Sequence, residues 1–332
     1  MELRFAILNP DGKDPLQLFP NGAGTPDDVG HPPINYHAYA ACVNGGFFQT
    51  EKQIPDSVSL VVVLLRRDLK HSLRAIEALK KRGIRSLVSW KESGAHQVAS
   101  ILNDAGRMRL FFEVCATADG FLSSTQSLLP VYLSSGCRKG SFIPTPYPVS
   151  QKEWDFEKQQ KEGIFLGTRE FDVPSRNHLA ALVAVCELAA RYNTHVVSIS
   201  PKVSRIEKEL LKRFPNFRIH KGKLPYKDYL ELMSRHRMVF QWDQSEVPGQ
   251  VAGDAALCRI PCVGGNSAIE RIIFPGLSSA NLSREETLNV AARLFEDEAF
   301  YKDSCVKSLD LALQNISYEA VAHSLNALLA ER

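Results

Sequence analysis

The sequence predicts an α/β protein made of two doubly wound, Rossmann-like domains that face a cleft. Short apolar runs rich in β-branched residues alternate with segments whose apolar residues recur every three or four positions. This alternation of strands and helices is typical of parallel sheets covered on both faces. The pattern stops once, at a proline-rich stretch near the middle of the chain, and then begins again.

Length and composition agree with this fold class, and they argue against a nucleic-acid-binding, secreted or membrane-spanning protein. The chain has 332 residues, which is more than one core usually supports. A formal net charge of +3 is too small for a nucleic-acid-binding protein. The first residues lack a signal-peptide pattern, and the apolar runs are too short to span a membrane. We therefore expect a cytoplasmic protein, attached at most to the surface of a membrane.

The cysteines favour reduced thiols over a metal site. They are seven in number, and most lie inside apolar runs. Cys258 and Cys262 are close together, but no second pair follows at zinc-ligand spacing. We expect neither a bound metal nor an organic cofactor.

The first domain is expected to comprise residues 1–145. Prolines 144, 146 and 148 cannot continue a helix or a central strand, and a charged stretch follows, so residues 146–162 are expected to form a linker. Within this domain we predict strands at 3–8, 59–65, 85–90 and 110–114, and helices at 35–48, 71–81, 96–104 and 124–135.

The second domain is expected to comprise residues 163–312, with residues 313–332 returning to the first domain as a helix. Ser175 is expected to cap the first helix, and Ser267 with Glu270 fits a capping box. We predict strands at 164–166, 196–200, 217–220, 238–242 and 261–264, and helices at 176–192, 205–214, 226–236, 249–258, 267–273, 284–295, 298–313 and 318–330.

The most informative pattern is a pair of acidic residues around a helix start. Glu246 and Asp254 are separated by seven residues that include a Pro-Gly turn, and the apolar run from Ile260 to Val263 follows. This pattern resembles the signature of retaining glycosyltransferases of the GT-B fold, the family that contains many hexosyltransferases. Asp254 stands where that family usually has Glu, and Arg259 stands where Gly is common.

The resemblance extends upstream and covers roughly residues 163–275. Gly167 to Arg169 resembles the basic turn after the first strand of the nucleotide domain, and Arg176 the second basic position. Lys223 and Leu224 lie in a turn that resembles the one meeting the nucleobase. The resemblance implies a metal-independent transfer with retention, from a UDP- or GDP-hexose to a sugar, lipid or small-molecule acceptor.

Physical chemistry assigns roles to the same residues. The guanidinium groups of Arg169 and Arg176 can bind a diphosphate through several charge-assisted hydrogen bonds. The helix that begins near Gly249 and Gln250 can add backbone N–H groups and the positive end of its dipole.

The two acids would contact the sugars of the donor. Asp254 could accept hydrogen bonds from the ribose hydroxyls. Glu246 could accept them from the transferred sugar and stabilise positive charge at its anomeric carbon. On the acceptor side, Gly22 and Gly24 lie in the loop after the first strand, which often faces the cleft in this fold.

Two alternatives stay open at this point. The short first domain, Asp254 and Arg259 leave room for a relative that binds a nucleotide or sugar without transferring it. A sugar-nucleotide epimerase has the same two-domain architecture, although the acidic and histidine groups it would need are not evident in the sequence.

Overall fold

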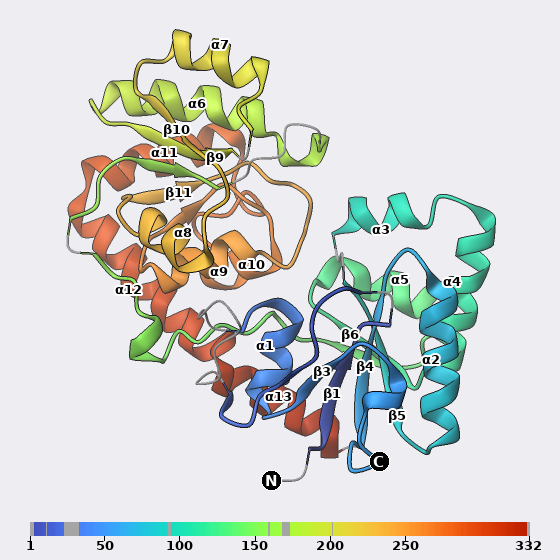
Figure 1. The fold of residues 1–332 in the computed structure, drawn as a ribbon. Helices are drawn as coiled ribbons and strands as arrows, with labels where there is room; N and C mark the ends of the chain where they lie inside the picture. The colour runs from blue at the N-terminus through green and yellow to red at the C-terminus, as the bar shows by residue number, and fades with distance from the viewer. Residues whose placement is uncertain are drawn as a thin grey trace. The chain divides into compact units, whose positions relative to one another are not determined.

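The computed structural model describes residues 3–10, 12–22, 33–91, 94–158, 160–167, 173–200 and 202–330. The chain forms two compact units. The N-terminal unit comprises residues 1–148, 246–248 and 316–332, and the C-terminal unit comprises residues 149–245 and 249–315. Each unit has its own sheet and its own helices (Figure 1).

The N-terminal unit is built on a seven-stranded sheet with the order β2-β3-β1-β4-β5-β6-β7. Neighbouring strands are parallel except β2 and β3, which are antiparallel. The strands are β1 (Phe5–Leu8), β2 (Gln17–Leu18), β3 (Gly46–Phe48), β4 (Leu60–Leu65), β5 (Arg85–Trp90), β6 (Gly120–Ser123) and β7 (Gly140–Phe142). The helices are α1 (Asn35–Cys42), α2 (Leu69–Lys81), α3 (Ala95–Ile101), α4 (Ala105–Thr117), α5 (Leu129–Ser134) and α13 (Tyr318–Ala330).

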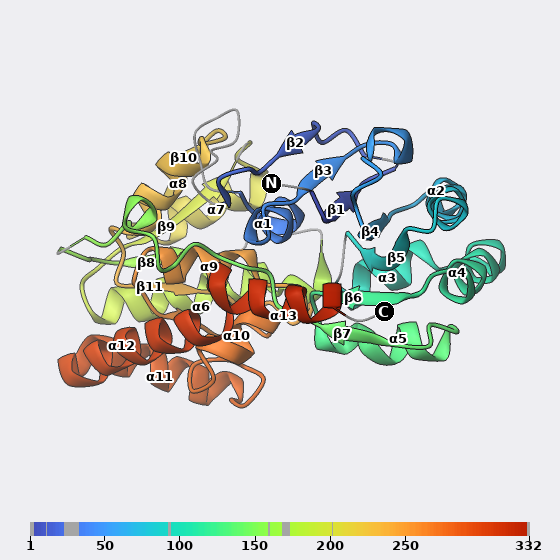
Figure 2. The ribbon, with the colours of Figure 1, turned by 90° about the horizontal axis from the view of Figure 1, so that it is seen from below.

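Alternation along the strands divides the core of this unit in two, because successive side chains point to opposite faces of a sheet. Ala6 and Leu8 of β1 pack with residues of α2, α4 and α5. Phe5 and Ile7 pack on the other face with residues of α1 and α13. Figures 1 and 2 show α13 running beside α1. The last helix of the chain therefore completes the core of the N-terminal unit.

Two predictions for this unit are wrong. Residues 110–114 form part of α4 rather than a strand, because Phe111, Val114 and Cys115 share one buried face of a helix. The helix predicted at 35–48 ends at Cys42, and a turn leads into β3. The structure also adds strands β2, β6 and β7, for which the sequence offered only weak apolar patterns.

The C-terminal unit contains a parallel five-stranded sheet with the order β10-β9-β8-β11-β12. Figure 1 shows α6 and α7 on one face of this sheet and α8 and α9 on the other. The strands are β8 (Ile164–Leu166), β9 (Val196–Ser200), β10 (Phe217–Lys221), β11 (Met238–Phe240) and β12 (Cys262–Val263). The helices are α6 (His178–Arg191), α7 (Arg205–Arg213), α8 (Tyr226–Met233), α9 (Gln250–Leu257), α10 (Ala268–Ile273), α11 (Arg284–Glu296) and α12 (Glu298–Asn315).

These elements confirm the predicted α/β class with doubly wound sheets. Among the helices of the described ranges, none has the length and apolar character required to cross a membrane.

Candidate functional site

The candidate site lies where the strand order of the C-terminal sheet reverses. From the central strand β8 the chain proceeds to β9 and β10 on one side, and later returns to β11 and β12 on the other. Ligands of doubly wound proteins bind beyond the carboxyl ends of the strands at such a switch point. Gly167 follows β8 there, and Gln241 follows β11.

Two glycines bring backbone close to this edge of the sheet. A Cβ atom at Gly167 would lie 2.7 Å from Cγ1 of Val251, so the first turn of α9 packs directly against the end of β8. Gly249 is the N-cap of α9 and has a left-handed backbone with φ of 103°. The first N–H groups of α9 have no partner within their own helix, and they form the positive end of its dipole. Such a helix start favours an anionic ligand.

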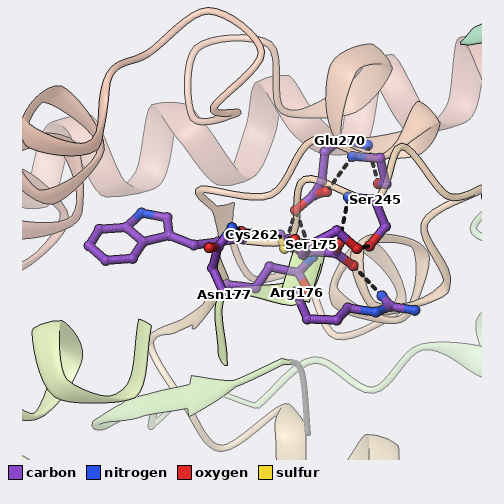
Figure 3. Close-up of polar contacts among 10 residues, drawn as sticks. Ser175, Arg176, Asn177, Ser245, Cys262 and Glu270 are labelled. Carbon is purple, nitrogen blue, oxygen red and sulfur yellow. Dashed lines mark hydrogen bonds and ion pairs between the residues drawn. The ribbon is translucent and has the colours of Figure 1, made fainter. Parts of the chain in front are cut away.

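Arg176 is fixed at the same edge by an ion pair. It ends the short 3₁₀ helix η5 (Pro174–Arg176), and its guanidinium donates to a carboxylate oxygen of Asp243 (Figure 3). The Arg176 side chain is 18% exposed, and that of Asp243 is 4% exposed. The other carboxylate oxygen of Asp243 accepts a hydrogen bond from the backbone N–H of Ser245 at 2.8 Å. Asp243 therefore orients Arg176 and compensates part of its charge.

Further contacts join η5 to the loop after β11. The hydroxyls of Ser175 and Ser245 are 2.7 Å apart, and the N–H of Gln244 donates to the carbonyl of Ser175 at 2.7 Å. The N-cap of α6 is Asn177, with φ of 48°, rather than the predicted Ser175. Ser175 instead bonds across to the loop after β11, and this holds Arg176 in place.

Glu270 of α10 bonds to Gln241, which follows β11, and has a structural role. The predicted capping box is confirmed, because Ser267 accepts from the N–H of Glu270 and Glu270 accepts from the N–H of Ser267. The Glu270 carboxylate also accepts hydrogen bonds from Gln241 at 2.7 Å and from the Cys262 thiol at 3.3 Å (Figure 3). Burial raises the pKa of Glu270, and these hydrogen-bond donors oppose that rise.

Asp254 is buried inside the unit. Its side chain belongs to α9, the residue is 1% exposed, and a carboxylate oxygen accepts a hydrogen bond from the hydroxyl of Tyr226. Burial raises the pKa of Asp254 to about 7, while hydrogen bonds from Tyr226 and Tyr229 act in the opposite direction. The group bonded to Asp254 is thus a tyrosine hydroxyl, and contact with a ribose stays a prediction for this acid.

The remaining predicted residues are spread over several segments. Lys223 is exposed and Leu224 half-buried in the turn between β10 and α8, and Gln250 is exposed in the first turn of α9. Glu246 is half-buried, has a left-handed backbone with φ of 52°, and belongs to the N-terminal unit.

On the predicted acceptor side, Gly22 has φ of 55°, and its N–H donates to the carbonyl of Phe19. Arg169 and Gly24 lie outside the described residues.

The structure adds residues that sequence reasoning missed, above all Tyr226 and Asp243. Tyr226 is the last residue of the segment from Lys221 that resembles the turn meeting the nucleobase, and that position was a usable signal. Asp243 gave no such signal in the sequence, because it is 67 positions from Arg176.

A cavity of about 210 Å³ also opens near the end of β11, where the guanidinium of Arg284 stands 5.3 Å from the Trp242 ring centre. Its lining consists of Asn177, Trp242, Gln244, Ser279, Leu282 and Arg284.

A parallel sheet with helices on both faces, and with glycines and a helix start at its switch point, defines the C-terminal unit as a doubly wound α/β fold. Comparison with solved structures, over 82–85% of this chain, identifies the fold as GT-B. A UDP-forming α,α-trehalose-phosphate synthase from Burkholderia xenovorans gives a TM-score of 0.60 at 12% identity, covering 84% of this chain and 75% of that one.

Two further structures show the same likeness. HepE from Anabaena, in complex with UDP-glucose, gives a TM-score of 0.59 at 13% identity, covering 83% of this chain and 79% of that one. The pneumococcal O-GlcNAc transferase GtfA, in complex with UDP and GlcNAc, gives a TM-score of 0.57 at 12% identity, covering 81% of this chain and 56% of that one. No protein-family model matches the sequence, and a search of curated proteins finds no match.

Proposed function

We propose that this protein transfers a hexose from a nucleotide diphosphate sugar to an acceptor, with retention of configuration and without a metal ion. Proteins of the same fold have been solved with UDP-glucose and with UDP and GlcNAc, which supports a nucleotide sugar as the donor. The observation that carries the proposal is the start of α9 at Gly249, packed against the end of β8. A diphosphate at that position would meet backbone N–H groups and the positive end of a helix dipole.

The chemistry requires positive charge at the leaving group. Cleavage between the anomeric carbon and the terminal phosphate oxygen leaves negative charge on the diphosphate, and preorganised donors lower the barrier. In this proposal the donors are α9, Arg176 and Arg169. The ion pair with Asp243 supports the assignment of Arg176, because it fixes the guanidinium before the donor binds.

Glu246 is proposed to contact the hydroxyls of the transferred sugar and to stabilise the developing charge on its ring. Its left-handed backbone supports this role. Residues other than glycine pay a conformational cost in that region, and such strain concentrates at functional sites.

A titration with nucleotides and sugar nucleotides tests the proposal. UDP, GDP, UDP-glucose and GDP-mannose would be added while the melting temperature and the release of free nucleotide are recorded, with EDTA and with Mg²⁺. We expect binding, and a release of nucleotide in which water takes the sugar in place of the acceptor, and EDTA should abolish neither. Release should be lost in Glu246→Gln and retained in Glu209→Gln, a change of an exposed acid on α7.

The other outcomes identify the alternatives. Binding without release in any variant indicates a non-catalytic relative, and conversion of one sugar nucleotide into its epimer indicates an epimerase. If no nucleotide binds, all three functions are excluded.

A further inference from the structure

A cavity of about 210 Å³ lies beside the starts of helices α6 and α11. Asn177, the N-cap of α6, and Arg284, the first residue of α11, both line it. Its described lining includes none of the proposed donor contacts, although Asn177 directly follows Arg176. Pockets for drug-sized ligands measure roughly 300–1,000 Å³, so this cavity suits a smaller molecule.

The acceptor oxygens of the polar side chains that line this cavity are already in use. Oδ1 of Asn177 accepts a hydrogen bond from Arg284 at 3.5 Å. Oε1 of Gln244 accepts one from Asn266 at 3.3 Å. Oγ of Ser279 accepts one from Gln244 at 2.6 Å. A ligand that mainly donates hydrogen bonds would have to compete with these protein donors.

Hydrogen-bond donors, in contrast, are left over. The Ser279 hydroxyl donates to no partner in the described ranges, and the Gln244 amide uses one of its two N–H bonds there. Arg284 donates one hydrogen bond, although a guanidinium has five N–H donors. The indole N–H of Trp242, which is 7% exposed, has no hydrogen-bond partner among the described residues. The cavity therefore favours a ligand rich in acceptor oxygens.

The positive charge at the cavity favours an anion among such ligands. Arg284 forms no ion pair with a carboxylate in the part of the chain that the structure describes, and its contacts are Oδ1 of Asn177 and the ring of Trp242. Both helices begin at the cavity, so their positive dipole ends lie there and disfavour an uncompensated cation. The acids in the first turn of α11, Glu285 and Glu286, are not part of the described lining.

We propose that this cavity binds a small phosphorylated molecule at a site separate from the donor site. A phosphate monoester presents three acceptor oxygens, which match the donor groups of Arg284, Ser279 and Gln244. Arginine can bind a phosphate through two parallel hydrogen bonds. Leu282 and the ring of Trp242 give the cavity an apolar wall, which would contact the carbon skeleton of the ligand. The site does not depend on the proposed function.

Calorimetric titrations of the full-length protein test this site. Glycerol 3-phosphate, inorganic phosphate and glycerol would each be added, with and without saturating UDP, which fills the proposed donor site. We expect glycerol 3-phosphate to bind at one site with the same affinity in both series. Inorganic phosphate should bind more weakly, because it leaves the apolar wall uncovered, and glycerol should not bind measurably. If UDP abolishes the binding, the cavity is not a separate site and the proposal is overturned.

Three variants show where the phosphate binds. Arg284→Gln should weaken the binding of glycerol 3-phosphate by about 10-fold or more, and Ser279→Ala by about 3-fold, because the first removes hydrogen bonds between two charged groups and the second a single neutral donor. Arg205→Gln is the matched control. Arg205 is the exposed first residue of α7, follows the same kind of Ser–Glu capping box as Arg284, and does not line the cavity. It should bind as the unaltered protein does.

Melting temperatures show that each variant is folded. Equal affinities of Arg284→Gln and Arg205→Gln for glycerol 3-phosphate, or no binding to the unaltered protein, would overturn the proposal. A protein that binds glycerol 3-phosphate in the expected pattern but binds no nucleotide would support this site and overturn the proposed function alone.

Discussion

Gly249 and Ser267 approach so closely that no side chain fits between them. A Cβ atom at Gly249 would lie 2.2 Å from Oγ of Ser267 and 2.8 Å from its Cβ. Ser267 cannot retreat, because its hydroxyl and its N–H both bond to Glu270. The start of α9 is therefore set by the capping box of α10, and the two helices hold the proposed diphosphate site together.

Gly249→Ala should destabilise the protein and abolish nucleotide binding. The left-handed backbone alone costs an alanine about 1–2 kcal/mol, and the contact with Ser267 adds about 1–3 kcal/mol of overpacking. Urea denaturation measures the sum. Gly222→Ala is the matched control, because Gly222 has the same φ of 103° but meets nothing within 4 Å. Equal losses from the two substitutions would show that the contact with Ser267 contributes nothing.

Glu246→Gly should abolish sugar transfer without loss of stability. Glycine relieves the cost of the left-handed backbone, about 1–2 kcal/mol, and adds unfolded-state entropy worth roughly 0.5–1 kcal/mol. The net change in the free energy of unfolding is thus small and favourable. Asn193→Gly provides the comparison, since Asn193 is exposed after α6 with φ of 47°. It should gain less stability than Glu246→Gly, because asparagine tolerates the left-handed region better than glutamate does, and it should leave transfer unaltered. A Glu246→Gly protein that transfers sugar normally would remove Glu246 from the mechanism.

Asp254 should make stability fall as the pH rises from about 4 to about 7. Burial raises the pKa of this carboxyl to about 7 from its ordinary value of 3.8. Within that window the folded protein holds a proton that the unfolded chain has released, so a rise in pH favours unfolding. The stability that the protonated Asp254 contributes is therefore fully present below pH 4 and is lost above pH 7.

Asp254→Asn isolates this effect, because asparagine does not titrate. The difference in unfolding free energy between the two proteins, measured in urea at several pH values, should shift in favour of the variant through the window. Tyr226→Phe removes a hydrogen bond that lowers the pKa of Asp254 and should extend the window above pH 7. A difference that is constant with pH would contradict the assignment.

Glu270→Gln should cost about 1–3 kcal/mol of stability, although it preserves shape. Each carboxylate oxygen of Glu270 faces a donor, namely the N–H of Ser267 on one side and Gln241 with Cys262 on the other. An amide would turn its own NH₂ toward one of these donors. Glu286→Gln alters the equivalent capping box on α11, where Glu286 is exposed and the amide oxygen can replace the acceptor. Thermal unfolding should show a clear loss for the first variant and a much smaller one for the second.

Elements with strong periodicity could be predicted from the sequence almost to the residue, as with α13 and β9. Short apolar runs could not. The run at residues 110–114 suits a strand, but in α4 Phe111 is buried and Phe112 is 45% exposed, a division that five residues do not reveal. Strand β6 was missed because a glycine and a serine occupy half of its four positions.

The residues of the candidate site likewise fall into those that the sequence predicts and those that it does not. A left-handed glycine before a helix and a Ser–Glu capping box are local features, so both Gly249 and the pair Ser267–Glu270 follow from the sequence. The partner of Asp254 lies 28 positions away on another helix. Which polar groups meet across a sheet edge depends on the packing of distant elements, and a single sequence does not specify it.

Helix α13 also determines when the N-terminal unit can finish folding. Tyr318 donates to the carbonyl of Pro33 at 2.6 Å, and Val321 and Leu325 fill the apolar layer above α1. During translation the ribosome makes this helix after the whole C-terminal unit. Until then this face of the first sheet has α1 but lacks α13, so part of its apolar layer is exposed. Nascent chains should therefore depend on chaperones, and premature stops before residue 318 should yield aggregation-prone products.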